Sequence, residues 1–412
     1  MHWLLAFPRL ALLAGLNLIP ATAAEITGLI LTWRNDPTTT QIIDWHQPTP
    51  EPLLFSYRIE GAADWTRITP EPARSFPYTD RWIHRVELTG LAADSRHEFR
   101  IGDGPVRVFQ TLPATLAKPL RFVIGGDNMH EREKFARMNR IAAALDQAFI
   151  VWGGDLAYED GQEAKVARMT TYVETLHETL VAPDGRIIPV VVGIGNHEVR
   201  GGYYWNSPHG HDWPANDEAR EEIAPYFYAL WAFPGHPGYG VLDLGDYASL
   251  LMLDTDHTGP VAGAQTVWLA AALATRPDRP HLLPIYHVPA YPSHRGFEGQ
   301  VSVRVREHWV PLFEAAGVRV AFEHHDHLYK RTAPLRGGQA HPDGVTYVGD
   351  GAWGVAVREP APDRDYLARA SAVNHAILAT MHPDYLELTA VDADGTVFDR
   401  FTIPARHTPA TE

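Results

Sequence analysis

The chain has 412 residues, of which 35 are Lys or Arg and 50 are Asp or Glu, so its formal net charge at pH 7 is −15. Its length allows two or three domains, and a hydrophobic content of 45% excludes a disordered chain. The acidic balance argues against a general nucleic-acid or anionic-membrane binder, because such proteins need a basic surface. Cysteine is absent, so any metal site must use nitrogen and oxygen ligands, to which 22 histidines can contribute.

Residues 1–24 are typical of a cleaved signal peptide. The N-terminal region contains Arg9 and is followed by an apolar run over residues 10–19. Pro20 and several small residues come next, as at a cleavage site. The run is shorter than the roughly 20 apolar residues of a membrane-spanning helix. We therefore expect an exported protein with no membrane association after cleavage, and the lack of cysteine favours a secreted or bacterial periplasmic location.

Residues 25–115 alternate in short apolar runs broken by Pro, Gly and Asp, a pattern that predicts a small all-β sandwich. The segment Leu88–Leu91, followed by residues 96–100, resembles the corner between strands E and F of a fibronectin type III-like domain. A linker is expected at residues 113–119. The strands are predicted at residues 41–45, 53–59, 82–88, 97–101 and 106–111.

From Leu120 onward, short continuous apolar runs alternate with amphipathic stretches, which predicts an α/β domain over residues 118–404 with a mostly parallel or mixed buried sheet. Helices are expected at residues 131–148 and 162–180, where apolar side chains recur at helical spacing. The buried strands are predicted at residues 121–125, 148–153, 187–193, 249–254, 281–287 and 318–323.

Polar side chains follow five of these strands, where ligands bind in open α/β sheets. A single Asp in this place is most often a helix N-cap, and a single His most often structural, but five such strand ends together indicate a site. The residues are Asp127, Asp155, Asn196 with His197, His287, and His325 to His327.

Carboxylate, amide and imidazole ligands without sulfur suit Fe, Mn or Zn, and this set is larger than one ion requires. Two metal ions that share a carboxylate are well suited to in-line displacement at phosphorus. The cations would also give an acidic protein a local site for an anionic substrate.

These residues lie in five blocks that resemble those of the calcineurin-like metallophosphoesterases in order and approximate spacing, over about residues 120–403. The blocks are Gly126-Asp127, Gly154-Asp155-Leu156-Ala157-Tyr158, Gly195-Asn196-His197-Glu198, Tyr286-His287-Val288-Pro289-Ala290-Tyr291 and His325-Asp326-His327-Leu328-Tyr329.

Within that superfamily the chain resembles the purple acid phosphatases. Asp127-Asn128-Met129 lacks the usual Asp-x-His, while Tyr158 stands where that family has a tyrosine ligand, and a sandwich domain precedes the catalytic domain. The resemblance implies an α/β (α+β) fold of two mixed β-sheets flanked by helices in four αββα layers.

The resemblance also implies a binuclear metal centre. Fe(III) would be held by Asp127, Tyr158 and His327, and Asp155 would bridge the two ions. The second ion, divalent Zn, Fe or Mn, would be held by Asn196, His287 and His325 together with Asp155.

Three further residues match substrate-contacting positions of the family. His197 would contact the substrate phosphate or the nucleophile, and His294 would protonate the leaving oxygen. Arg295 stands where a second histidine is usual and would anchor phosphate, although a solvated loop arginine is the alternative. The usual glycine before the last block is His324, for which we expect a structural role.

The expected activity is hydrolysis of small phosphate monoesters by in-line attack of a metal-bound hydroxide. A phosphodiesterase or nucleotide pyrophosphatase with the same bimetal centre is the alternative. A non-catalytic exported binding module with a vestigial site is disfavoured, since every family ligand position is filled.

Overall fold

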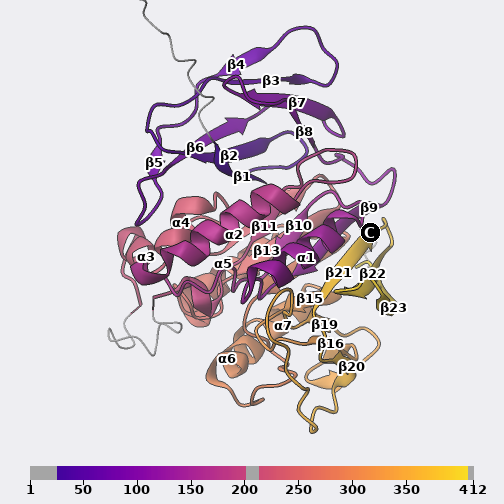
Figure 1. The fold of residues 1–412 in the computed structure, drawn as a ribbon. Coiled ribbons are helices and arrows are strands. Elements are labelled where there is room, and N and C mark those ends of the chain that lie inside the picture. Colours follow the sequence, from indigo (N-terminus) through magenta and orange to yellow (C-terminus); the bar gives the residue numbers. More distant parts are fainter. Residues whose placement is uncertain (1–25, 201–212, 407–412) are drawn as a thin grey trace, which may run out of the picture.

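The computed structural model describes residues 26–200 and 213–406, and Figure 1 shows a β-sandwich stacked on a larger layered domain. The predicted signal peptide lies outside the described residues. Within these two ranges, no helix has the length and apolar character needed to cross a bilayer.

The N-terminal unit consists of two four-stranded sheets packed face to face. One has the order β1-β2-β6-β5 and the other β4-β3-β7-β8. Alternate side chains of both sheets, such as Trp45, Phe55 and Phe99, form a closed apolar core between them. The strands are β1 (Thr27–Thr32), β2 (Gln41–Gln47), β3 (Phe55–Ile59), β4 (Thr66–Ile68), β5 (Arg74–Ser75), β6 (Trp82–Leu88), β7 (Arg96–Ile101) and β8 (Arg107–Gln110).

The larger unit contains two mixed sheets. The first has the order β11-β10-β9-β21-β22-β23, and the second has the order β12-β13-β14-β15-β19-β16-β20. The first comprises β9 (Leu120–Gly125), β10 (Ile150–Trp152), β11 (Val190–Val192), β21 (His375–Met381), β22 (Tyr385–Asp392) and β23 (Val397–Pro404). The second comprises β12 (Gly240–Leu244), β13 (Ala248–Leu253), β14 (His281–Tyr286), β15 (Val320–Glu323), β16 (Tyr329–Thr332), β19 (Thr346–Gly349) and β20 (Leu367–Ser371), and a separate hairpin pairs β17 (Leu335–Arg336) with β18 (Gln339–Ala340).

Apolar side chains of the two sheets, among them Ile124 and Ile285, pack against each other in one core. Helices α1 and α2 cover the outer face of the first sheet, and α5, α6 and α7 cover the second. The four-layer αββα arrangement expected from the resemblance is confirmed. The helices are α1 (Arg132–Ala143), α2 (Val166–Thr179), α3 (Asp217–Ile223), α4 (Pro225–Leu230), α5 (Thr266–Ala274), α6 (Gln300–His308) and α7 (Val310–Ala315), with short helical turns η1 (Glu163–Lys165), η2 (Asn196–Glu198) and η4 (Val261–Gln265).

The predicted strands all occur, with ends within three residues of those expected. The first predicted helix ends earlier than residue 148, because Asp146 adopts a left-handed conformation with φ of 53°. Strands β1, β4 and β5 of the sandwich, and β12 and β16 to β23 of the layered domain, were not among the predictions. Strands β4 and β5 are too short to give a periodic pattern.

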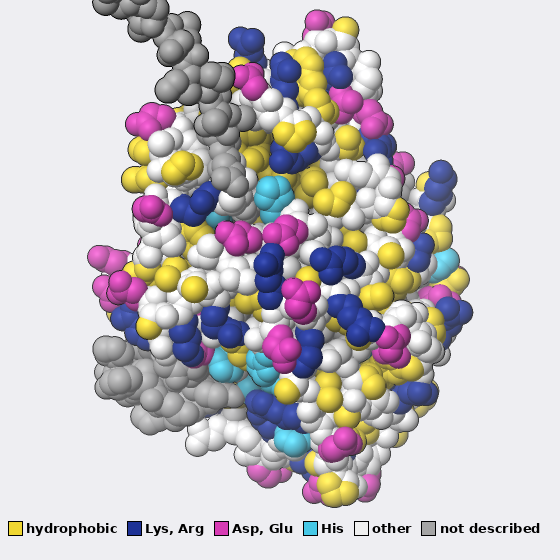
Figure 2. Space-filling view, in the orientation of Figure 1, with side chains coloured by type: hydrophobic (Ala, Val, Ile, Leu, Met, Phe, Trp, Pro, Cys, Tyr) yellow, Lys and Arg dark blue, Asp and Glu magenta, His cyan; other side chains and the backbone are white. Residues whose placement is uncertain are grey.

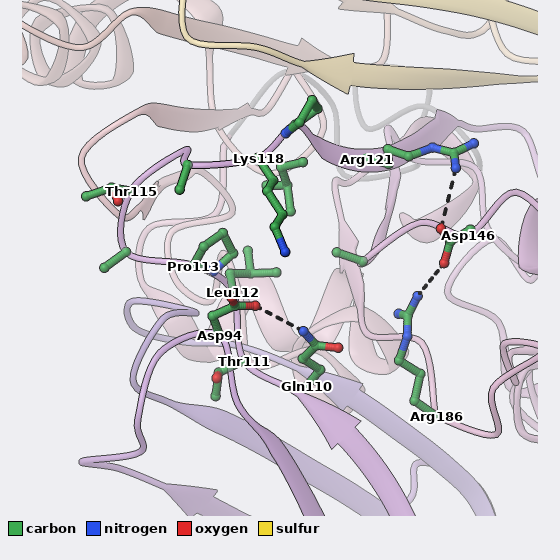
Figure 3. Close-up of a pocket in the computed structure, with 15 residues that line it drawn as sticks. Asp94, Gln110, Thr111, Leu112, Pro113, Thr115, Lys118, Arg121, Asp146 and Arg186 are labelled. Atoms are coloured by element: carbon green, nitrogen blue, oxygen red, sulfur yellow. Dashed lines mark hydrogen bonds and ion pairs between the residues drawn. The ribbon is translucent and has the colours of Figure 1, made fainter.

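A buried ion pair ties the sandwich to the layered domain. Arg85 contacts Asp44 through two nitrogens and donates a further hydrogen bond to the carbonyl of Leu230. A cavity of about 490 Å³ lies where the linker joins the two units. Figure 3 shows Lys118 extending into it. None of the predicted site residues lines it, so this cavity is separate from the predicted metal centre.

Strands β9, β10 and β11 are parallel neighbours in the first sheet, and β14 and β15 are parallel neighbours in the second. Their carboxyl ends therefore lead into loops at the same edge of the layered domain, where the predicted site residues lie.

Candidate metal centre

The structure brings all seven predicted metal ligands together at these carboxyl ends, and all seven side chains are buried. The first sheet contributes Asp127 after β9, Asp155 and Tyr158 after β10, and Asn196 in η2 after β11. The second contributes His287 after β14 and His325 and His327 after β15.

Four of these side chains, those of Asp127, Asp155, Tyr158 and His327, form a first group. Ligand atoms of Asp127, Asp155 and His327 all lie within 4.8 Å of one another. The hydroxyl of Tyr158 is 3.2 Å from Oδ1 of Asp127 and 3.1 Å from Nε2 of His327. One ion placed among these atoms could contact all four side chains.

A second group shares Asp155 with the first. Ligand atoms of Asp155, His287 and His325 lie within 4.8 Å of one another. Nε2 of His287 is 3.1 Å from Oδ2 of Asp155 and 3.2 Å from Oδ1 of Asn196. The two groups thus meet at one carboxylate, as a bridged pair of ions requires.

Five of the seven predicted ligands have a positive φ, a conformation that non-glycine residues rarely adopt. They are Asp127, Asp155, Tyr158, His325 and His327, with φ between 54° and 83°. Such conformations cost about 1–3 kcal/mol each and cluster at functional sites. Their concentration here indicates loops shaped to aim side chains inward.

Backbone donors fix the two carboxylates. Asp127 accepts the N–H of His325 through Oδ2 at 2.9 Å, and Asp155 accepts the N–H of His197 through Oδ1 at 2.8 Å. Glu198 accepts the N–H groups of Asp155 and Leu156 and so joins the second block to the third. The blocks therefore brace one another across the two sheets.

His324 has the structural role predicted for it. Its buried imidazole packs on Gly126 and Gly153, where any side chain on either glycine would clash with the ring. Its Nδ1 lies 2.9 Å from the carbonyl oxygen of Tyr286. The ring thus fills the space between the strand ends beneath the predicted ligands.

The buried carboxylates Asp127 and Asp155 favour positive charge beside them. Burial raises the pKa of Asp155, but His287 and His197 outweigh this effect and hold the pKa well below its usual range. Burial lowers the pKa of His287, but Asp155 and Asp127 raise it to about 9. Burial, reinforced by Asp127 and Asp155, raises the pKa of Tyr158 well above its ordinary value. Ionisation of this phenol therefore requires an adjacent cation.

The donor set fits two metal ions. It offers oxygen and nitrogen atoms alone, two buried carboxylates, and a phenol that a highly charged ion could ionise.

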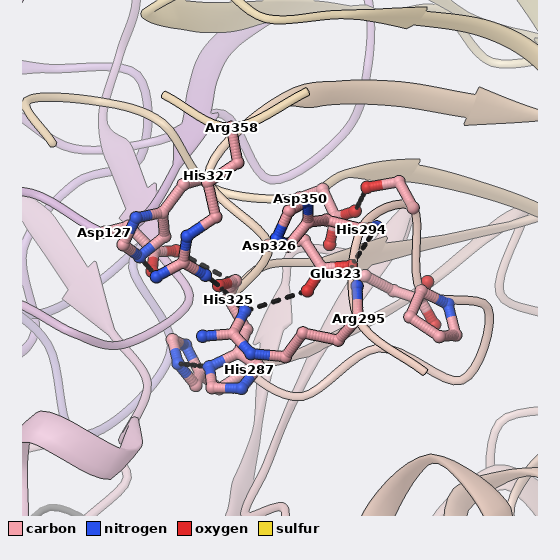
Figure 4. A network of polar contacts seen from close by, with 12 residues as sticks. Asp127, His287, His294, Arg295, Glu323, His325, Asp326, His327, Asp350 and Arg358 are labelled. Carbon is pink, nitrogen blue, oxygen red and sulfur yellow. Dashed lines mark hydrogen bonds and ion pairs between the residues drawn. The ribbon is translucent and has the colours of Figure 1, made fainter. Parts of the chain in front are cut away.

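Two of the three predicted substrate residues, His197 and Arg295, border this cluster. His197 is half-buried, with Nε2 4.0 Å from Oδ2 of Asp155. His294 is exposed, and its Nδ1 lies 2.7 Å from the carbonyl oxygen of Glu359. Arg295 donates to the carbonyl of His325 and to Oδ1 of Asp326 (Figure 4). Thus Arg295 is anchored beside the predicted ligands.

Several neighbours of the site were missed from sequence. A pocket of about 310 Å³ beside Tyr158 and His197 is also lined by His130, Asp160, Lys165 and Arg168. Figure 2 shows histidine and basic side chains gathered in the lower half of one face. His130 directly follows Asp127-Asn128-Met129, so its nearness to the site could have been inferred from the sequence. Asp160, Lys165 and Arg168 lie on segments without a motif.

Comparison with known proteins identifies the class. A family model described as calcineurin-like phosphoesterase matches residues 120–329, about half of the chain, and the chain belongs to this family. A model for the N-terminal domain of purple acid phosphatases matches residues 26–112. This match and the plant relatives described next support the predicted resemblance to the purple acid phosphatases.

Two relatives come from Arabidopsis thaliana. Purple acid phosphatase 18 is 27% identical over 317 residues, which cover 71% of this chain and 64% of that protein. Purple acid phosphatase 21 is 26% identical over 310 residues, which cover 70% and 62%. The match thus spans less than two thirds of the length of either plant protein.

Two solved structures share the fold. Purple acid phosphatase PPD1 from yellow lupin seeds has a TM-score of 0.75 at 17% identity and covers 93% of this chain and 75% of its own. GAP50, described as the anchor in the inner membrane complex of Plasmodium, has a TM-score of 0.50 at 13% identity and covers 70% and 90%. PPD1 and GAP50 have different descriptions although both share this fold. The fold alone therefore does not establish catalysis, and the evidence for catalysis must come from the site.

Proposed function

We propose that this chain is an exported two-metal phosphohydrolase that hydrolyses phosphate monoesters. The observation that carries the proposal is the pair of buried ligand groups that meet at Asp155. The resemblance to the purple acid phosphatases supports it. The proposed domains are the sandwich over residues 25–115 and the catalytic domain over residues 118–404, after a signal peptide of residues 1–24.

In this proposal Asp127, Tyr158 and His327 hold Fe(III), and Asn196, His287 and His325 hold divalent Zn, Fe or Mn. Asp155 would contact both ions. When bound, two such ions lower the pKa of water and polarise a phosphoryl group. The chain's part is to fix the ligands through the backbone hydrogen bonds to Asp127 and Asp155.

His197 is proposed to contact the substrate phosphate. Its Nδ1 lies 2.5 Å from Oδ1 of Asp160, which orients the ring and leaves Nε2 on the side of Asp155. Burial lowers the pKa of His197, but Asp155 and Asp160 outweigh it and raise the pKa above its ordinary value. A protonated ring there would donate to a phosphate oxygen.

His294 is proposed to protonate the leaving oxygen, and Arg295 to anchor phosphate. The backbone N–H groups of both residues donate to Oδ2 of Asp326, at 2.7 and 3.2 Å. This shared acceptor holds the loop over the site. The proposed substrates are small molecules, because the proposed activity acts on small phosphate monoesters. The net charge of −15 argues against a general nucleic-acid-binding surface.

The test measures bound metal and turnover of p-nitrophenyl phosphate and bis-p-nitrophenyl phosphate on the same preparation. We expect two metal ions per chain and faster turnover of the monoester. Faster turnover of the diester would favour the phosphodiesterase alternative. A metal-loaded protein inactive on both, and on nucleotides, would favour the binding-module alternative.

Export is tested by expressing the full chain with its first 24 residues in a bacterial host. We expect the protein in the periplasm or medium with an N-terminus near Glu25, as read by N-terminal sequencing. Retention in the cytoplasm with residues 1–24 intact would contradict the assignment.

A further inference from the structure

A second arginine, absent from the five sequence blocks, reaches the predicted metal centre. Arg358 belongs to an irregular segment after β19, and its backbone N–H donates to the carbonyl of His327 at 3.0 Å. Nδ1 of His327 in turn lies 3.2 Å from the carbonyl oxygen of Ala356. The segment is therefore fixed to the last block.

The side chains of Arg358 and Arg295 meet at one atom. Nη1 of Arg358 lies 3.4 Å from the carbonyl oxygen of His325, and Nη1 of Arg295 donates to the same oxygen. Figure 4 shows the two side chains extending toward His325 from different sides. Two guanidinium groups that share one acceptor are close neighbours of like charge.

The surroundings compensate only part of this charge. Arg295 is ion-paired with Asp326 at 2.8 Å, and Asp326 also accepts the backbone N–H groups of His294 and Arg295. Over residues 26–200 and 213–406, Arg358 makes no ion pair with a carboxylate. A planar fork of donors suits an anion that offers two or more oxygens, such as a phosphate group.

The position of this pair relates it to the leaving group. His294, the proposed acid, is the neighbour of Arg295 in sequence, and its Nδ1 contacts the carbonyl of Glu359, the neighbour of Arg358. The two arginines therefore lie on the same side of the site as His294. The metal ligands, by contrast, would face the phosphoryl group that is transferred.

We propose that Arg358 and Arg295 form an anion clamp for a second phosphate carried by the leaving group, and that Arg358 is a specificity-determining residue. The inference rests on the proposed function. It assigns a preference for substrates in which a further phosphate adjoins the scissile bond over those with an uncharged alcohol leaving group.

The test compares ADP, whose leaving group bears a phosphate, with AMP, whose leaving group does not. We expect Arg358→Ala to lower kcat/KM for ADP about tenfold or more, since it removes a charged hydrogen bond, with little change for AMP. Arg358→Lys should recover part of the preference as a single point charge. The matched control is Arg140→Ala, an exposed arginine on α1.

An equal loss on ADP and AMP, or no loss on either, would overturn the clamp. Turnover of p-nitrophenyl phosphate by the wild-type protein and by Arg358→Ala tests the proposed function separately. If neither protein turns over this ester, calorimetric titration of the metal-loaded proteins with ADP still decides the clamp. Equal affinity in wild type and Arg358→Ala would then overturn it.

Discussion

The ammonium nitrogen of Lys330 lies 2.6 Å from Oε2 of Glu323, and both side chains are completely buried. The other oxygen of Glu323 accepts the hydroxyl of Tyr286 and the N–H of Ala290, on the segment that carries His287. Burial lowers the pKa of Lys330, but Asp350 and Glu323 outweigh it and raise the pKa above its ordinary value. Lys330 is therefore charged, and its contact with Glu323 holds this segment against β15 and β16.

Lys330→Met should lower the free energy of unfolding by about 3–5 kcal/mol, because it leaves the Glu323 carboxylate buried without its cation. Urea unfolding followed by circular dichroism measures the loss. The double variant Glu323→Gln with Lys330→Met should regain part of it, since the Glu323 carboxylate is then absent, although Asp350, 3.6 Å from Nζ of Lys330, still lacks its partner. A loss below about 1 kcal/mol for the single variant would contradict a buried charged pair.

Removing ligands of the second group should deplete one ion selectively. His287→Ala and Asn196→Ala should each lose metal from that group and lower turnover by orders of magnitude, while the first group keeps its four side chains. Asp155→Ala should deplete both ions, because its carboxylate belongs to both groups. Metal per chain by elemental analysis and kcat on p-nitrophenyl phosphate are the readouts.

The matched control for these variants is His308→Ala, at the end of α6 and outside both ligand groups. It should keep full metal content. Near wild-type turnover of either His287→Ala or Asn196→Ala would contradict a two-metal mechanism.

Asp160 should act through His197. Asp160→Asn weakens the 2.5 Å contact with Nδ1 and removes the charge that favours the protonated ring. We expect kcat/KM for p-nitrophenyl phosphate to fall about tenfold, with metal content unchanged, the loss expected for a charged hydrogen bond. Glu163→Gln, an exposed acid nearby on η1, is the control and should be neutral. Unchanged kinetics in Asp160→Asn would exclude a positioning role.

Much of this site was accessible from sequence because its ligands follow strands that are short and apolar. Parallel strands end at one edge of a sheet, so the polar residues after β9, β10 and β11 had to lie near one another, as did those after β14 and β15 in the second sheet. The resemblance supplied the division of ligands between two ions. The geometry then shows Asp155 in both groups, as the resemblance implied.

The missed residues share a different property. Arg358 and Lys330 act through contacts with segments distant in the chain, and neither position has a period or spacing that marks it. Lys330 directly follows the last block, and its partner Glu323 lies on the other side of that block. Pairings of this kind depend on how loops fold back over the sheets, which local sequence patterns do not encode.

The identity of the first ion has a spectroscopic test. The pKa of Tyr158 lies well above its ordinary value, because burial, Asp127 and Asp155 all oppose ionisation. A visible tyrosinate charge-transfer band in the metal-loaded protein would therefore require a strongly Lewis-acidic ion, as proposed for Fe(III). Tyr158→Phe should abolish the band. A colourless protein that contains only Zn or Mn would overturn the Fe(III) assignment and leave hydrolysis untouched.

His46 in the sandwich should make stability depend on pH. The side chain is buried against Phe76, and neither ring nitrogen has a hydrogen-bond partner among the described residues. Burial, assisted by the positive charge of Arg81, lowers the pKa of His46 to about 3. The neutral ring is therefore the form that the folded sandwich accommodates.

Between pH 6.5 and about 3 the unfolded chain binds a proton at His46 that the folded chain does not, so the free energy of unfolding falls as the pH falls. The slope for one proton is about 1.4 kcal/mol per pH unit, which gives a loss of about 2–3 kcal/mol from pH 6.5 to pH 4.5. His46→Phe keeps an aromatic ring beside Phe76 and should remove this part of the acid sensitivity, while the half-exposed control His341→Gln should retain it. Urea unfolding of the three proteins at both pH values decides the matter: parallel losses in wild type and His46→Phe would show that other groups set the acid limit.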